Sequence, residues 1–494
     1  MDHTRKNRIM LSAPRSGSGK TTVTCALLKT LKDKGMDVAG FKCGPDYIDP
    51  LFHKKILGIE SRNLDTFFAG EDGVGAILSA ARQDYAVIEG VMGLYDGLDV
   101  GGTKGSAYEI ADLTDTPIVL IVDASGVGRT VISLIKGMLL DDEKGLIRGL
   151  ILNQITPHFY EKLKPVLEME LRSMREDVRL FGFFPKDPKI SIKSRHLGLM
   201  LPEEVGDIKD KLEQAAKMLE DHVDVNGLIS LMQEAGEKED ASVTEKAQEA
   251  ENPERIHVIS SGPNLTLAVA YDEAFCFYYK DNLELFEKLG VTIRYFSPLH
   301  DKSLPEGIDG ILLGGGYPEN YAEKLSANAS MRAAIRKAIE DGIPSLAECG
   351  GFMYLHKSVT DREGRSYEMA GACDGACSFA GHLVRFGYLE VAAVNELQKA
   401  VMTANQVMRY NDGNENEILE SMVGLRGHEF HYYESSDNGD ALRVWKPDHS
   451  MLRNAMICKN NGIWGFPHFY YPSAPRFAEN FVLRMKEVSY GKFK

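Results

Sequence analysis

At residues 13–21 the chain reads Ala13-Pro14-Arg15-Ser16-Gly17-Ser18-Gly19-Lys20-Thr21. This stretch follows an apolar run, Ile9–Leu11, and precedes a helical pattern that starts near Thr22. A strand, a glycine-bearing loop, Lys-Thr and a helix, in this order, are typical of a phosphate-binding loop. Ala13 stands where the usual pattern has its first glycine. The stretch predicts a nucleotide-binding α/β domain.

The chemistry of this loop indicates how it would bind a nucleotide. Gly17 and Gly19 allow a tight turn that points several backbone N–H groups at one anion, and the helix N-terminus adds partial positive charge. Lys20 can reach the outer phosphates, and the Thr21 hydroxyl can bind Mg²⁺. The residues expected to bind ATP in this segment are Ser16, Gly17, Ser18, Gly19, Lys20, Thr21 and Thr22.

Length and composition limit the class of protein. The chain has 494 residues, too many for a single hydrophobic core, so more than one domain is expected. The formal net charge of −15 argues against nucleic acid as a partner, and no apolar run is long enough to span a membrane. Seven scattered cysteines favour reduced thiols and a cytoplasmic protein.

The first 200 residues alternate between short apolar runs and helical patterns, which predicts a mostly parallel, buried sheet. The expected strands are Arg8–Ala13, Val38–Cys43, Tyr85–Glu89, Ile118–Asp123, Gly149–Asn153 and Arg179–Phe184. We assign residues 1–232 to this first domain. Residues 233–255 are charged and almost lack bulky apolar side chains, so they are expected to form a linker.

A second α/β pattern occupies residues 256–494. Its expected strands include Thr266–Ala270, Thr292–Phe296, Ile308–Leu313 and Pro344–Ala347. Two of these runs end in glycine-bearing segments, Gly314-Gly315-Gly316 and Glu348-Cys349-Gly350-Gly351. This arrangement predicts a second α/β domain with a site of its own.

Three acidic segments follow strands in the first domain: Gly44–Pro50, Glu89–Gly97 and Asp123. Ligands of parallel sheets bind beyond the carboxyl ends of the strands, so these carboxylates are expected to lie near the phosphate-binding loop. Mg²⁺ bound to phosphates needs only one or two protein carboxylates. Asp46 and Glu89 are therefore the candidate metal ligands, together with Thr21.

Cys349 lies between an apolar strand and a helical pattern, where a sharp turn exposes a nucleophile. The next backbone N–H groups can bind an oxyanion, which makes Gly350 a candidate donor and Gly315 a second one. A thiol nucleophile needs a base, and His468, in Gly465-Phe466-Pro467-His468, is the candidate. The second domain is thus predicted to perform acyl transfer at a cysteine.

Two further patterns have no assigned chemistry. His428-Glu429-Phe430-His431 has its histidines three apart, which is not the spacing of a zinc-protease helix, so a structural or substrate-contacting role is favoured. The segment Tyr271–Tyr279 is rich in aromatic residues, and packing or binding of a large flat ligand both stay open.

The motifs together resemble the cobyrinic acid a,c-diamide synthase family of corrinoid biosynthesis. The matching segments are Ala13–Thr22, Gly44–Pro50, Asn63–Asp65, Glu89–Gly97, Arg195–Leu199, Tyr271–Leu283, Leu313–Glu319, Ala347–Gly351 and Gly427–Tyr432. They occur in order over nearly the whole chain. The resemblance implies an ATP-binding amidoligase domain, similar to dethiobiotin synthetase, followed by a class I glutamine amidotransferase domain.

The resemblance also implies roles for individual residues. Cys349 would be the glutaminase nucleophile and His468 its activating histidine. Asp49 and Asp96 would lie near the substrate carboxylate, and Asn153 resembles the asparagine that reads adenine in related synthetases. Many amidotransferases have a Glu two residues after the histidine, whereas this chain has Tyr470 there. A Cys-His dyad is therefore expected.

The implied activity is ATP- and glutamine-dependent amidation of the a and c acetate groups of cobyrinic acid, with Mg²⁺ as cofactor. Two alternatives stay open. One is the same chemistry on nickel sirohydrochlorin, and the other is a nucleotide-switched assembly ATPase with an inactive amidotransferase domain. The implied partners are cobyrinic acid or a related tetrapyrrole and L-glutamine, and a homodimer also stays open.

Overall fold

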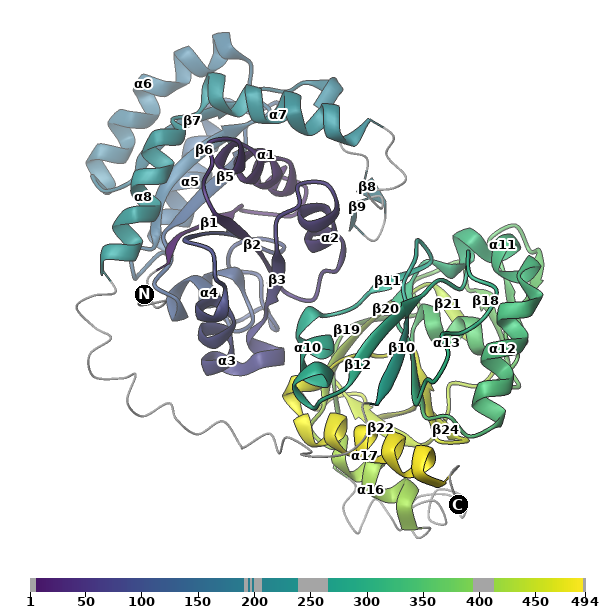
Figure 1. The fold of residues 1–494 in the computed structure, drawn as a ribbon. Coiled ribbons are helices and arrows are strands. Elements are labelled where there is room, and N and C mark those ends of the chain that lie inside the picture. Colours follow the sequence, from purple (N-terminus) through teal and green to yellow (C-terminus); the bar gives the residue numbers. More distant parts are fainter. Residues whose placement is uncertain are drawn as a thin grey trace. The chain divides into compact units, whose positions relative to one another are not determined.

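The chain forms two compact units, Met1–Asn252 and Pro253–Lys494 (Figure 1). The structure, a computed structural model, describes residues 6–190, 194–195, 198–199, 207–238, 265–393 and 413–491. Both units are α/β, so the predicted fold class is confirmed. Among the described helices, none combines the length and the apolar character that crossing a bilayer requires.

The first unit is built on a seven-stranded, wholly parallel sheet in the order β3-β2-β4-β1-β5-β6-β7. Its strands are β1 (Asn7–Ser12), β2 (Val38–Cys43), β3 (Ser61–Leu64), β4 (Tyr85–Glu89), β5 (Ile118–Asp123), β6 (Ile147–Asn153) and β7 (Arg179–Phe184). Its longer helices are α1 (Lys20–Asp33), α2 (Ile48–Lys55), α3 (Thr66–Ala80), α4 (Ala107–Leu113), α5 (Thr130–Leu140), α6 (Pro157–Met174), α7 (Ile208–His222) and α8 (Val225–Lys238). Four of the predicted strands, β2, β4, β5 and β7, have the expected bounds.

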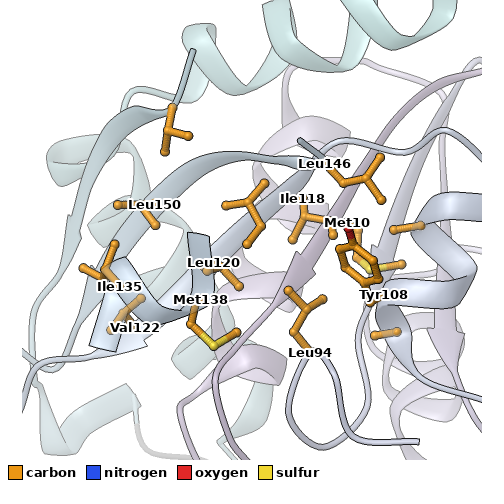
Figure 2. Close-up of a cluster of buried hydrophobic side chains, with 14 of the residues drawn as sticks. Met10, Leu94, Tyr108, Ile118, Leu120, Val122, Ile135, Met138, Leu146 and Leu150 are labelled. Carbon is orange, nitrogen blue, oxygen red and sulfur yellow. The ribbon is translucent and has the colours of Figure 1, made fainter. Parts of the chain in front are cut away.

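The core of the first unit fills the space between the sheet and its helices. Figure 2 shows side chains of the central strands, Ile118, Leu120 and Val122 from β5, beside Ile135 and Met138 of α5. All three strand residues are fully buried. Burying such side chains on both faces explains why these strands read as continuous apolar runs in the sequence.

The last helix of the first unit extends into the segment expected to be a linker. Helix α8 continues to Lys238 and packs against β1. Its buried side chains, Leu228, Leu231, Met232 and Ala235, repeat at helical spacing, which keeps residues 233–238 in the helix. The rest of the expected linker, up to residue 255, lies outside the described residues. In the Arg195–Leu199 motif, the structure describes only two short strands, β8 (Ser194–Arg195) and β9 (Gly198–Leu199), and leaves 196–197 outside.

The second unit has a six-stranded sheet in the order β12-β10-β13-β15-β25-β24, parallel except at β24. Its strands are β10 (Thr266–Ala270), β12 (Thr292–Phe296), β13 (Gly310–Leu313), β15 (Ser345–Glu348), β24 (Ile457–Lys459) and β25 (Gly462–Gly465). Its helices include α10 (Lys280–Lys288), α11 (Ala322–Ala327), α12 (Ala329–Glu340), α13 (Gly350–Leu355), α16 (Gly413–Ser421) and α17 (Pro475–Gly491).

Smaller sheets complete the second unit. A five-stranded antiparallel sheet has the order β23-β22-β19-β20-β26, and a pair joins β11 to β14. These strands are β11 (Phe275–Phe277), β14 (Gly315–Gly316), β19 (Arg385–Val391), β20 (Arg426–His431), β22 (Leu442–Trp445), β23 (Arg453–Ala455) and β26 (His468–Tyr470). A four-stranded sheet contains β16 (Ser358–Thr360), β17 (Ser366–Glu368), β18 (Ala376–Phe379) and β21 (Tyr433–Ser435). Sequence periodicity did not predict these sheets, because most of their strands are only three or four residues long.

Candidate active sites

The phosphate-binding loop joins β1 to α1 with both glycines in the left-handed region, at φ 77° for Gly17 and φ 88° for Gly19. A Cβ at Gly19 would also overlap the side-chain amide of Asn153. That amide donates to the Ser18 carbonyl at 2.7 Å, and its oxygen accepts from the Gln154 N–H at 2.8 Å. In this structure Asn153 therefore stabilises the phosphate-binding loop by a hydrogen bond. The predicted contact of Asn153 with adenine stays a prediction.

Lys20 connects the loop to the Glu89–Gly97 segment. Its Nζ donates to the Met92 carbonyl at 2.5 Å and to the Arg15 carbonyl at 3.3 Å. The side chain is buried, and burial, with the nearby Lys42, lowers the pKa of Lys20 to about 8. Asp96 accepts the Gly93 N–H at 2.8 Å and acts electrostatically on Lys20, so it lies at the same end of the sheet.

The expected carboxylates meet beside the first turn of α1. Thr21 Oγ1 donates to Glu89 Oε1 at 2.6 Å and lies 3.5 Å from Asp49 Oδ2. Burial raises the pKa of Glu89 to about 7, and Asp49 adds to the rise. Asp46 is more local: its Oδ1 accepts the Ile48 N–H at 2.8 Å and so shapes the turn before α2.

Lys42, which sequence analysis missed, lies at the centre of this cluster. Its Nζ is 2.5 Å from Asp49 Oδ2 and 2.9 Å from Glu89 Oε1, and all three side chains are buried. Burial lowers the pKa of Lys42, but the two carboxylates outweigh burial and hold it well above its ordinary value. The available signal was a lysine inside an otherwise apolar strand, because a buried charge needs a partner.

The donor set at this cluster fits Mg²⁺. Glu89 Oε2 is buried without a hydrogen-bond partner among the described residues, and the Thr21 hydroxyl lies beside the same carboxylate. In the described part of the chain, no three His, Cys, Asp or Glu side chains form a metal cage. Because Mg²⁺ on phosphates keeps most of its ligands from phosphate and water, one carboxylate and one hydroxyl suffice.

In the second unit, Cys349 occupies a strained turn between β15 and α13. Its backbone has φ 46° and ψ −103°, a conformation that L-residues rarely adopt. Cys349 is 7% exposed as a residue, and burial raises the pKa of its thiol, with Glu319 and Glu429 adding to the rise and the Gly350 N–H opposing it. A thiol in this setting needs a base to form the thiolate.

His468 and the turn that carries Cys349 both pack against the short strand β14. A Cβ built at Gly315 would overlap the His468 Cε1 and lie 3.1 Å from its Nδ1. A Cβ built at Gly350, the residue after Cys349, would lie 3.1 Å from the Gly316 nitrogen. The structure thus brings together the glycine loop, the imidazole and the nucleophile turn. Burial lowers the pKa of His468 well below its ordinary value, which keeps the ring neutral and able to accept a proton.

The aromatic segment Tyr271–Tyr279 supports this glycine loop. The Tyr278 hydroxyl accepts the Gly314 N–H at 2.8 Å, and Phe277 pairs with Gly315 in the β11–β14 ladder. The Phe277 ring also packs against Tyr317 at 5.2 Å. The described contacts of these residues favour packing around the loop.

Glu348, the residue before the nucleophile, anchors the strand that carries the histidine. Its Oε1 accepts from the Tyr471 hydroxyl at 2.8 Å and from the Phe469 N–H at 3.4 Å. Burial raises the pKa of Glu348 to about 8. Tyr470 occupies the position of the missing glutamate, and its hydroxyl donates to Asp281 Oδ2 at 3.1 Å.

Gly315→Ala is expected to disable the glutamine reaction selectively. Gly315 does not adopt a positive φ, so alanine adds little backbone strain, and the three nearest atoms to the new methyl group all belong to His468. Displacing the imidazole by about 1 Å is expected to lower glutamine-dependent turnover roughly a hundredfold. Glutamate release and ammonium-dependent amidation, measured side by side, check this.

The matched control is Gly491→Ala at the end of α17, where no described atom lies within 4 Å of an added Cβ. It should leave both reactions unchanged. Unaltered glutamate release by the Gly315→Ala protein would show that the imidazole does not need this space.

The fold and these two sites define a class: a phosphate-loop nucleotide-binding unit joined in one chain to a glutamine amidotransferase unit. Residues 9–199 match the model of the CobQ/CobB/MinD/ParA nucleotide binding domain, and residues 266–462 match that of the CobB/CobQ-like glutamine amidotransferase domain.

Three curated relatives are each named cobyrinate a,c-diamide synthase. The relative from Clostridium acetobutylicum is 39% identical, over 94% of this chain and 97% of its own. The relative from Caldanaerobacter subterraneus is 39% identical, over 86% of this chain and 85% of its own. The relative from Clostridium tetani is 36% identical, over 93% of this chain and 96% of its own. The chain therefore belongs to the cobyrinate a,c-diamide synthase family.

Proposed function

We propose that this chain is a glutamine-dependent C–N ligase that amidates the a and c acetate carboxylates of cobyrinic acid in corrinoid biosynthesis. The observation that carries the proposal is the presence of both half-sites in one chain. A phosphate-binding loop lies beside buried carboxylates in the first unit, and in the second unit a strained cysteine turn and a buried histidine pack against the same short strand, β14. The names of the relatives support the substrate.

In the first unit, the γ-phosphoryl group of ATP is transferred to a substrate carboxylate and leaves ADP. Residues 16–22 bind the phosphates through backbone N–H groups, and Lys20 balances charge on the transferring group. Mg²⁺, when bound by Thr21 and Glu89, with Asp46 nearby, neutralises further phosphate charge. Lys42, Asp49 and Asp96 lie at this edge of the sheet, where they position the carboxylate being activated.

In the second unit, His468 takes the thiol proton of Cys349, and the thiolate attacks the glutamine side-chain amide. Ammonia leaves with a proton returned from the imidazole, and water then hydrolyses the thioester to glutamate. The Gly350 and Gly315 N–H groups are the proposed oxyanion donors. Ammonia then displaces phosphate from the acyl phosphate and forms the amide.

The proposal assigns amidation to residues 1–232 and glutamine hydrolysis to residues 256–494. An assembly ATPase with an inactive second unit is disfavoured, because the chain has Cys349 at the nucleophile turn and His468 with its ring against Gly315 of β14.

Mass spectrometry of the products tests the substrate. We expect cobyrinate, incubated with ATP, Mg²⁺ and glutamine, to show two successive mass decreases, each equal to replacing one hydroxyl group by an amino group. Nickel sirohydrochlorin in a parallel incubation provides the comparison. Preferential conversion of nickel sirohydrochlorin, or no conversion of cobyrinate, would contradict the assignment.

A further inference from the structure

A second buried histidine lies directly beside the proposed base. In the antiparallel pairing of β20 with β26, His428 is the register partner of His468, so the two side chains share one face of the sheet. Their ring centroids are 5.0 Å apart and the ring planes differ by 15°. With Gly315 against its Cε1 edge, His468 is therefore flanked by a glycine and by an imidazole.

The position of the His428 ring is itself fixed. The Tyr279 hydroxyl lies 3.1 Å from His428 Nδ1, and the Tyr279 ring packs edge-on against Tyr470 at 5.8 Å. His428 is 9% exposed, and burial lowers its pKa to about 3. The ring is therefore neutral over the physiological pH range, and it contacts the His468 ring by stacking.

Many amidotransferases have a glutamate two residues after the histidine that acts as base. Tyr470 occupies that position and points its hydroxyl to Asp281. After burial, His428 and His431 are the groups that lower the pKa of His468, and the His431 Nδ1–H donates to the Tyr433 carbonyl at 2.7 Å. Tyr388, on β19, is the register partner of His428 on its other side.

We propose that His428, held by Tyr279, is the positioning residue that orients His468 for proton transfer from Cys349. This inference rests on the proposed glutamine hydrolysis. A base must keep one tilt and one tautomer while it takes the thiol proton and returns it to ammonia, and a fixed neighbour supplies this orientation. Burial keeps the pKa of His468 low, and a neutral neighbour orients the ring without stabilising the imidazolium.

Two variants test the proposal by glutamate release. His428→Gln removes the ring, and Tyr279→Phe removes only the hydroxyl group that fixes it. Loss of orientation is expected to lower the glutaminase kcat about tenfold to a hundredfold in His428→Gln, and less in Tyr279→Phe, with KM for glutamine unchanged. Ammonium-dependent amidation, which needs neither residue, should keep its wild-type rate, and the unchanged KM for glutamine shows that the second unit is folded.

The pH dependence of iodoacetamide alkylation at Cys349 separates orientation from packing and needs no substrate. A thiol that loses its oriented base should react more slowly near neutral pH, with its profile moved to higher pH. His382→Gln and Tyr490→Phe, at exposed positions of the second unit, are the matched controls and should match the wild type.

Wild-type kcat and an unchanged alkylation profile in both variants would overturn the role of His428. A wild-type protein that releases no glutamate would instead contradict the proposed function, and the alkylation profiles would still report on the histidine pair.

Discussion

Lys20→Ala is expected to abolish amidation whether the nitrogen comes from glutamine or from added ammonium. The Lys20 ammonium is buried at the mouth of the phosphate-binding loop, 2.5 Å from the Met92 carbonyl. Phosphoryl transfer depends on positioning and on charge neutralisation at the transferring group, and alanine removes both. We expect a decrease of about 10³-fold in ADP release and in amide formation, a size typical of losing one such cation.

Lys34→Ala, at the other end of α1, is the matched control. It removes the same charge from the same segment, but Lys34 makes only a partly exposed ion pair with Glu220, of a kind worth about 0–1 kcal/mol. Its amidation rate should equal that of the wild type. If a folded Lys20→Ala protein formed amide within a few-fold of the wild-type rate, the role of the loop in ATP use would be refuted.

Cys349→Ala is expected to eliminate glutamine-dependent amidation and to preserve amidation with ammonium. The thiolate forms the covalent intermediate, so without sulfur the glutamine reaction should fall to the background rate. The first unit, which contains Lys20 and Glu89, is untouched and should still activate the carboxylate. Glutamate release and product masses, measured with each nitrogen source, check both halves of this expectation.

The control is Cys458→Ala in β24, which removes another buried thiol of the same unit. It should retain both activities. Loss of both reactions in a folded Cys349→Ala protein would contradict the division of labour between the two units.

Much of the fold was predictable because its signals are local. The bounds of β2 and β5 follow from largely apolar, largely buried runs, whereas α1 begins at Lys20, two residues before the predicted start near Thr22. The short strands of the second unit were not predictable in this way. Strands such as β14 and β26 have two or three residues and are stabilised by their partners in the ladders.

The candidate sites, like the fold, were predictable from the sequence only in part. The sequence predicted Thr21, Asp46 and Glu89 as metal ligands. In the structure the Thr21 hydroxyl donates to Glu89 at 2.6 Å, whereas Asp46 accepts a backbone N–H in the turn before α2. Sequence spacing did not indicate Lys42, whose two carboxylate partners come from α2 and β4. A lysine in an apolar strand indicates that a neutralising partner exists, but the strand sequence does not say which residue it is.

By itself, the sequence determined which segments carry chemistry. A glycine loop followed by Lys-Thr and a cysteine followed by two glycines can each be recognised from residues that are adjacent in the chain. Only the tertiary structure decided which of them act together. Gly315 makes room for His468, and His428 flanks the same ring, because strand order and register bring these distant segments into contact. No single segment specifies its neighbours across a sheet, since that choice depends on how all the strands bury their apolar faces together.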